Sequence, residues 1–301
     1  MQKNDNIETY RHSIDMIAHD KELWNSVIAS MSLQEVMKHI SPFTEDDVPV
    51  SDTVATVRVS KDPSFAAAMK TPEDERVAVL NFASWHFPGG GVEYGANAQE
   101  EALCRISTLH PCLLDETMER DFYGPHRSIR DPLYNDDLIY TPNVVVFKSD
   151  DDECRVLPRE KWRRVDVVTM AAPNVAAASP ERLEYVNLDV LYRRRIGKVM
   201  KAAYSHGATT LVLGAFGCGV FGNDPERVAH ATCDMIGRYG RYFRNIEIPV
   251  YCGQNTTGRT NYDVFADVFS ERLGKNVVID VDGPEKQVRR PEREDRGRGG
   301  R

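Results

Sequence analysis

The stretch that decides the fold is NFASWHFPGGGVEYGANAQEEALCR, residues 81–105. It begins inside the apolar run VAVLNFAS (77–84), which is typical of a strand buried on both faces. A glycine triplet (89–91) follows, and the sequence QEE (99–101) opens a predicted helix. Glycines let a backbone approach a ligand closely, and carboxylates at a helix start lie beside unpaired N–H groups. The stretch therefore predicts a ligand site at the end of a buried strand.

Taken alone, the two glutamates have an ordinary explanation. Asn97 could cap the helix with Glu100 as its capping-box partner, and acidic first turns are common. The order strand, PGGG, seven-residue spacer, QEE and helix is more specific, because it gathers three polar side chains and a bare backbone at one strand end.

A second glycine loop lies in LVLGAFGCGVFGNDPERVAHA, residues 211–231. Asp224 as N-cap and Pro225 as the first helical residue mark the start of a helix. The glycines before them favour a phosphate-binding loop. The spacing also fits a dinucleotide fingerprint, but the next predicted strand, IEIPVYCG (246–253), ends without the acidic residue that a nicotinamide enzyme needs.

Strands alternate with helices along the rest of the chain. A helical face runs from Leu188 to Ala203, and Ser32 with Glu35 suggests a capping box before VMKHI. The remaining predicted strands are TVATVRVS (53–60), VVVFK (144–148), VDVVTM (165–170) and TTLVLGAF (209–216), and FAAAMK (65–70) is a predicted short helix. This alternation predicts an α/β fold with a mixed, partly parallel sheet between helices.

The pattern divides the chain into three parts. We expect an N-terminal helical extension at 1–50, an α/β domain at 51–283, for which the resemblance described next implies a macrodomain-like catalytic domain, and a disordered Arg/Gly-rich tail at 284–301. The tail carries +3 and the remainder −11, for a net charge of −8, which argues against a dedicated duplex-DNA binder. No apolar run approaches the roughly 18 residues of a membrane span. The six cysteines are scattered without zinc spacing, which favours an intracellular protein with no metal site.

The motif PGGG-x7-QEE resembles the signature of the bacterial-type, macrodomain-based branch of the poly(ADP-ribose) glycohydrolases. The resemblance extends in the family's order through YTPNVVVFK (140–148), VDVVTMAAPN (165–174) and GAFGCGVFGNDP (214–225). It implies a macrodomain-like fold and hydrolysis of the ribose–ribose O-glycosidic bonds of poly(ADP-ribose), without a cofactor. Poly(ADP-ribose) or an ADP-ribosylated protein would be the partner of a monomeric enzyme. A mono-ADP-ribosyl hydrolase and a non-catalytic ADP-ribose reader remain as alternatives.

The resemblance also implies roles for individual residues. Glu101 would be the catalytic acid/base, and Glu100 would hold hydroxyls of the ribose that is released. The catalytic loop would be shaped by Gln99, Gly89, Gly90 and Gly91. The substrate diphosphate would lie on Gly217, Cys218, Gly219, Val220, Phe221 and Gly222, with Phe221 beside the distal ribose. Phe87 stands where many relatives carry Asn, which affects the expected preference for polymer or mono-ADP-ribose.

Other conspicuous side chains have structural explanations first. Asn174 suits a Pro–Asn turn, and Cys218 is interpreted as a small residue rather than a nucleophile. Arg193–Arg195 are predicted to be a solvated helix face, with a polymer-binding patch as the lesser alternative. Tyr251 and Phe265 are predicted to be core aromatics.

Overall fold

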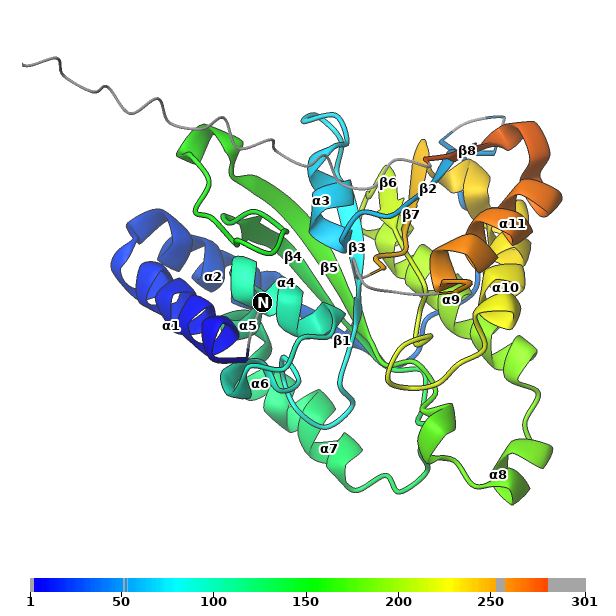
Figure 1. The fold of residues 1–301 in the computed structure, drawn as a ribbon, viewed down its shortest axis with the longest axis horizontal. Helices are drawn as coiled ribbons and strands as arrows, with labels where there is room; N and C mark the ends of the chain where they lie inside the picture. The colour runs from blue at the N-terminus through cyan, green and yellow to red at the C-terminus, as the bar shows by residue number, and fades with distance from the viewer. Residues whose placement is uncertain (1–2, 51, 53, 253–257, 281–301) are drawn as a thin grey trace, which may run out of the picture.

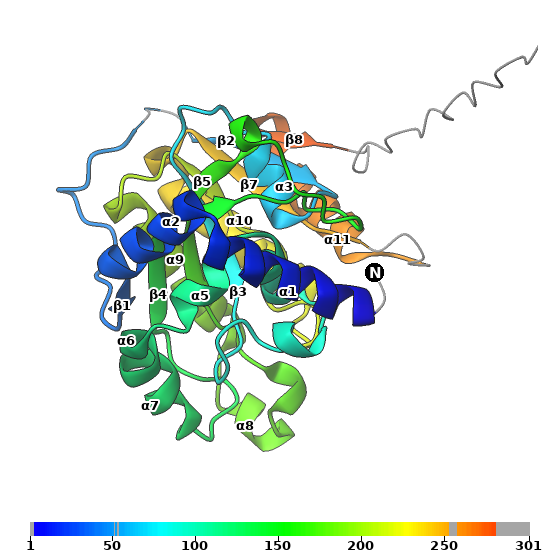
Figure 2. The ribbon, with the colours of Figure 1, turned by 90° about the vertical axis from the view of Figure 1, so that its left-hand side faces the viewer.

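The computed structural model describes residues 3–50, 52, 54–252 and 258–280. Over these residues the chain forms one eight-stranded mixed sheet with helices on both faces, which confirms the predicted α/β class (Figures 1 and 2). The strand order is β1-β4-β5-β3-β6-β7-β2-β8. The strands are β1 (Glu35–Met37), β2 (Thr56–Ser60), β3 (Val77–Phe82), β4 (Leu138–Val146), β5 (Arg163–Met170), β6 (Thr210–Val212), β7 (Asn245–Pro249) and β8 (Val277–Ile279).

Strand β3 shows why the sheet lies inside the molecule. Val77 and Val79 pack into the hydrophobic cluster on one face, whereas Ala78 and Leu80 pack into the cluster on the other. The period-2 alternation of a strand thus buries apolar side chains in both directions. A continuous apolar run is the sequence consequence, as predicted for 77–84.

The helices form a layer on each face of the sheet (Figure 1). One layer contains α9 (Leu188–Ser205), α10 (Pro225–Tyr239) and α11 (Asn261–Leu273). The other contains α1 (Lys3–His19), α2 (Lys21–Leu33), α3 (Ser64–Met69), α4 (Gln99–Ile106) and α5 (Leu109–Leu113). The short helical segments are η1 (Val92–Tyr94), α6 (Glu116–Met118), the π-turn η2 (Glu119–Tyr123), α7 (Gly124–Arg127), η3 (Arg159–Lys161), η4 (Val175–Ala177), α8 (Pro180–Glu184), η5 (Gly240–Tyr242) and η6 (Gly274–Asn276).

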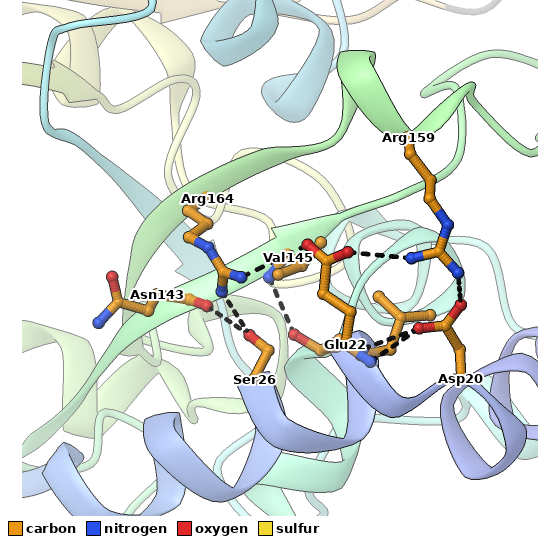
Figure 3. Close-up of polar contacts among 9 residues, drawn as sticks. Asp20, Glu22, Ser26, Asn143, Val145, Arg159 and Arg164 are labelled. Atoms are coloured by element: carbon orange, nitrogen blue, oxygen red, sulfur yellow. Dashed lines mark hydrogen bonds and ion pairs between the residues drawn. The ribbon is translucent and has the colours of Figure 1, made fainter.

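The N-terminal helices are fastened to the same sheet. Asp20 caps α2 by accepting hydrogen bonds from the backbone of Glu22 and Leu23, and Arg159 pairs with both Asp20 and Glu22 (Figure 3). Ser26, one turn further along α2, donates to the carbonyl of Asn143 on β4. The boundary expected at residue 50 stays a prediction, and the predicted tail at 284–301 lies outside the described residues.

Two local predictions are wrong. Ser32 and Glu35 do not form a capping box, because α2 already runs through Ser32 to Leu33. Glu35 instead begins β1, which pairs antiparallel with β4 through Val36 and Ile139. The strand predicted at 209–216 is also shorter, since β6 ends at Val212.

The arrangement of parallel strands determines where a site can form. β3 is paired in parallel with β5 on one side and β6 on the other. The loops that leave the carboxyl ends of these three strands therefore emerge side by side at one edge of the sheet. In parallel α/β sheets this edge is where ligands bind.

Candidate active site

The first glycine loop joins β3 to α4 and is anchored by the side chain of Gln99. Its amide oxygen accepts a hydrogen bond from the backbone N–H of Phe82 at 2.8 Å. Its amide nitrogen donates to the carbonyl of Leu80 at 2.8 Å and to the hydroxyl of Ser64 at 3.0 Å. Gln99 therefore fixes the start of α4 against the end of β3.

The carboxyl groups of Glu100 and Glu101 both lie next to the backbone of Gly90 in the first glycine loop. Glu101 accepts from the N–H of Gly91 and from the N–H of Ala98, both at 2.9 Å. A Cβ atom at Gly90 would stand 2.4 Å from Oε1 of Glu101 and 3.2 Å from Oε2 of Glu100. Gly90 also has φ +61°, so a side chain there is excluded both by space and by backbone conformation. The predicted cap is displaced by one residue: the N-cap is Ala98 rather than Asn97, and Glu101 rather than Glu100 accepts the hydrogen bond from the N-cap backbone.

Glu100 lies in an unusual electrostatic environment. The residue is 3% exposed, and its carboxyl group accepts from the N–H of Ser84 at 2.6 Å and from the amide of Asn81 at 3.1 Å. Burial raises the pKa of Glu100 to about 8; the two hydrogen bonds oppose this shift and the neighbouring Glu101 adds to it. Asn81, which also donates to Thr169 at 3.2 Å, is a site residue that the sequence analysis missed, because an Asn inside an apolar strand gave no distinct pattern.

A histidine beneath the glycine triplet was also missed. His110 lies 3.2 Å from the carbonyl of Pro88 through Nε2 and 2.9 Å from the hydroxyl of Tyr10 through Nδ1. Burial lowers the pKa of His110, so the ring is neutral, donates from Nε2 to Pro88 and accepts from Tyr10 at Nδ1. A Cβ atom at Gly89 would stand 2.3 Å from this ring. Helix α1 thus supports the loop through Tyr10, a contact across a hundred residues for which the local sequence contains no signal.

The second glycine loop follows β6 and presents unpaired backbone donors. Gly217 has φ +76° and Gly222 has φ +67°, which the tight turn requires. The N–H groups of Gly219, Val220 and Phe221 have no hydrogen-bond partner among the described residues, and the Val220 side chain is exposed. Three consecutive free N–H groups make a concave anion-binding surface.

Helix α10 itself is already capped. Asp224 accepts from the N–H groups of Glu226 and Arg227 at 2.8 and 3.3 Å, and Pro225 has no N–H group. The predicted cap is therefore confirmed. An anion at this position would bind the loop backbone rather than the helix N-terminus.

Asn223 holds the second loop in place and was not predicted as a separate functional residue. Its amide nitrogen donates to the carbonyls of Gly217 and Pro173 at 2.9 and 2.8 Å, and its oxygen accepts from the hydroxyl of Tyr192 at 2.8 Å. The backbone N–H of Ala176 donates to the carbonyl of Phe221 at 3.0 Å. The loop after β6 is thereby joined to the loop after β5.

The two glycine loops leave neighbouring parallel strands, β3 and β6, at the carboxyl edge of the sheet. A Cβ atom at Gly214 would stand 3.0 Å from the ring of Phe82, and that ring lies 5.8 Å from the ring of Phe216. Trp85, buried after β3, stacks on His126 at 3.7 Å and on Tyr134 at 4.7 Å. The ends of β3 and β6, from which the two loops leave, are therefore in contact, and Phe87 in the first loop is 61% exposed.

Several secondary predictions can be checked. Asn174 accepts from the N–H of Ala177 in a turn, and Phe265 is buried in the core, as predicted. Burial raises the pKa of the Cys218 thiol to about 12, which agrees with a non-nucleophilic residue. Tyr251 is 53% exposed and so is not a core aromatic. Arg195 is fully buried and donates to the carbonyls of Ala171 and Leu133, so the prediction of a solvated face is wrong for this residue.

The described residues contain no group of His, Cys, Asp or Glu side chains arranged to hold a metal ion. All six cysteines are free thiols. No described helix has the length and apolar character needed to cross a membrane.

Comparison with known proteins gives the class. Residues 11–149 match the family model described as microbial-type PARG, catalytic domain. The poly(ADP-ribose) glycohydrolase of Thermomonospora curvata is 30% identical with a TM-score of 0.73, over 88% of this chain and 100% of that chain. The same enzyme bound to the inhibitor ADP-HPD gives a TM-score of 0.72, at 30% identity over 88% of this chain and 99% of that chain.

A further solved relative is the poly(ADP-ribose) glycohydrolase of Deinococcus radiodurans in complex with ADP-ribose. It is 31% identical with a TM-score of 0.70, over 81% of this chain and 97% of that chain. No curated protein sequence matches this chain. The fold and the site define a macrodomain-like glycosidase. The chain belongs to the microbial-type poly(ADP-ribose) glycohydrolase family.

Proposed function

We propose that this enzyme hydrolyses the ribose–ribose O-glycosidic bonds of poly(ADP-ribose) and releases ADP-ribose, with Glu101 as the general acid and base. One observation supports this assignment above the others. The carboxyl groups of Glu100 and Glu101 both lie next to Gly90, in the loop that follows β3. The free N–H groups of Gly219, Val220 and Phe221 lie in the loop that follows β6, the strand paired with β3. An acid and an anion-binding backbone side by side suit a substrate that joins a sugar ether to a diphosphate.

The geometry limits how the two glutamates can share the reaction. Consecutive residues of a helix are about 100° apart around its axis, so Glu100 and Glu101 cannot lie on opposite faces of one sugar. The usual arrangement of two carboxylates that flank the scissile bond is therefore excluded. Glu100, more deeply buried and tied to β3 through Asn81, is the residue that positions the ribose hydroxyls.

Glu101 then carries both proton transfers. It gives its proton to the glycosidic oxygen as the bond from the anomeric carbon to that oxygen breaks, and the ribose ring becomes oxocarbenium-like. A water molecule, positioned by the diphosphate on the 217–222 loop, adds to the anomeric carbon. Glu101 takes the proton that this water loses, so the carboxyl group ends as it began.

The variant Glu101→Gln tests the assignment. We expect release of ADP-ribose from polymer to fall by at least about a hundredfold, the usual contribution of a positioned acid/base. The Kd for ADP-ribose, measured by calorimetry, should stay within a few-fold of wild type. Glu8→Gln, an exposed glutamate on α1, is the matched control. Wild-type turnover by Glu101→Gln would refute the role of Glu101.

The preference for polymer or for mono-ADP-ribosylated protein needs a separate experiment, because Phe87, next to the glycine triplet, stands where many relatives carry Asn. We propose that polymer is preferred over a mono-ADP-ribosylated protein, and product release from both substrates at equal ADP-ribose concentration measures this. Faster release from the mono-modified protein would support the alternative. We also propose that the enzyme is an intracellular monomer, which fits its six free cysteines, and light scattering would test the monomeric state.

A further inference from the structure

A cavity of about 970 Å³ lies away from the candidate active site, between α9, α10, the end of α11 and the loop that contains Phe43. None of the residues predicted for the active site lines it, but Arg193 and Arg194, part of the alternative polymer-binding patch of the sequence analysis, do. We call it the distal groove. Its cationic lining residues are Arg193, Arg194, Lys198, Arg238 and Arg272.

The distal groove has an excess of positive charge in an otherwise acidic protein. Asp234 is the single acidic residue among the described residues that line it, and it pairs with both Arg193 and Arg272 at 2.6 Å. Asp136 lies just outside the distal groove and forms ion pairs with Arg194, Arg195 and Lys198. Five cations therefore line the distal groove, against Asp234 within it and Asp136 beside it, and Arg238 pairs with neither carboxylate among the described residues. This excess of positive charge points to an anionic ligand.

The rest of the lining is apolar and partly aromatic. Ile40, Pro42 and Phe43 come from the loop, and Met235 and Tyr239 come from α10. Phe43 stacks on Tyr239 with ring centroids 4.4 Å apart, which makes one wall rigid. A pocket that combines apolar walls with arginines suits a ligand with a flat base and phosphates. An adenine nucleotide unit has both.

The distal groove is connected to the second glycine loop by the seam between α9 and α10. Arg227 in the first turn of α10 pairs with Asp189 in the first turn of α9 at 2.7 Å, beside the loop that precedes α10. Further along the same seam Asp234 pairs with Arg193. At 1.5 Å per residue, Asp234 lies about 10 Å along α10 from Arg227. A ligand in the groove and one on the loop therefore lie within reach of a single chain.

Building on the proposed function, we propose that the distal groove binds a second ADP-ribose unit of the same poly(ADP-ribose) chain that occupies the active site. A second contact on one polymer converts an independent binding event into an intramolecular one and raises the affinity for long chains selectively. A nucleic acid has related chemistry, but it would lack the connection to a site that holds another part of the same molecule.

The test uses the full chain with the double variant Arg238→Glu/Arg272→Gln. Arg238 is exposed without an ion pair among the described residues, and Asp234 keeps Arg193 as a partner when Arg272 is replaced. The matched control is Arg11→Glu/Arg159→Gln, which changes an exposed arginine on α1 and an ion-paired one on η3, whose partner Asp20 is the N-cap of α2 on the other face of the sheet. The melting temperature of each variant checks that it is folded.

The readouts are kcat/KM for long, size-fractionated poly(ADP-ribose) and for its dimer, and the Kd for ADP-ribose. In the double variant we expect kcat/KM for long chains to fall about five- to tenfold, and kcat/KM for the dimer, which has a single second unit to offer, to fall less; the Kd for ADP-ribose, which has no second unit, should stay within about twofold. The slope of log Kd for long polymer against log salt should shrink by about 0.7 for each phosphate contact removed. The control should match wild type.

Three results would overturn the proposal, each in a distinguishable way. If wild type hydrolyses polymer and the double variant keeps the wild-type preference for long chains, the distal groove alone is refuted. If an RNA oligonucleotide of equal charge binds wild type but not the double variant, while long polymer binds both equally, the groove is a nucleic-acid site instead. If wild type neither binds ADP-ribose nor hydrolyses polymer, the proposed function fails and this inference fails with it.

Discussion

Replacing Glu100 with Gln should change how the stability of the enzyme depends on pH. Burial raises the pKa of Glu100 to about 8, whereas the same carboxyl group in the unfolded chain titrates near 4.5. Between these values the folded protein holds a proton that the unfolded chain has released. Stability is therefore greatest below pH 4.5 and is lost as the pH rises through 8.

The magnitude follows from the width of that window. Each pKa unit corresponds to 1.36 kcal/mol, so wild type should lose about 4 kcal/mol of unfolding free energy from Glu100 alone between pH 5 and pH 9. Gln cannot ionise, so Glu100→Gln should be spared this loss. At pH 9 the variant should be more stable than wild type by several kcal/mol, relative to their difference at pH 5.

Urea denaturation at pH 5, 7 and 9 measures this difference. Two other buried acids, Asp150 and Glu247, have pKa values raised by burial to about 6 and 7, but they are present in both proteins and cancel in the comparison. Glu271→Gln removes an exposed glutamate and should follow wild type. If the stability curves of wild type and Glu100→Gln run parallel from pH 5 to pH 9, Glu100 is ionised throughout and the reasoning is wrong.

The remaining predictions concern the two loops. Gly90→Ala must adopt φ +61° and displace the Glu101 carboxyl group, so thermal melts should show a loss of about 1–3 kcal/mol and polymer turnover should fall at least tenfold. Tyr10→Phe removes the hydroxyl that His110 accepts from, and should cost about 1–2 kcal/mol and lower kcat more than it raises KM. Asn223→Ala leaves the Pro173 carbonyl and the Tyr192 hydroxyl without this partner and removes one of the two hydrogen bonds to the Gly217 carbonyl, and calorimetry should show weaker ADP-ribose binding and a loss of about 1–3 kcal/mol. Activity and ADP-ribose affinity equal to wild type in any of these variants would contradict the role given to that residue.

The parts of the fold that the sequence predicted share a physical origin. Val77 to Leu80 alternate between two buried faces, so the strand appears as a continuous apolar run. Strand β1 was missed because three residues at a sheet edge bury little side chain, and the pattern around Glu35 resembled a helix start. Edge strands are defined by the neighbour that they pair with, here β4, and no local pattern records that partner.

The same distinction, between local sequence pattern and distant partners, separates the site residues that were predicted from those that were missed. Glu100, Glu101 and the glycines were predicted because their function imposes a local spacing between a strand and a helix. Asn81 and Asn223 were missed because their roles depend on distant partners, such as Thr169 and Tyr192, that only the folded chain brings near. The polar residues that orient a site are, in general, set by tertiary contacts rather than by sequence neighbours.

Asn81 also explains how one buried pocket can serve both protonation states of Glu100. Its amide nitrogen donates to the Glu100 carboxyl group, and this hydrogen bond suits the ionised form of Glu100. Its amide oxygen is buried without a hydrogen-bond partner among the described residues. A half-turn of the amide would present that oxygen as the acceptor that protonated Glu100 needs, because a neutral acid must donate. An apolar residue at position 81 could serve neither state, and an aspartate would add a like charge, so the amide is the side chain that lets Glu100 titrate without unfolding its surroundings.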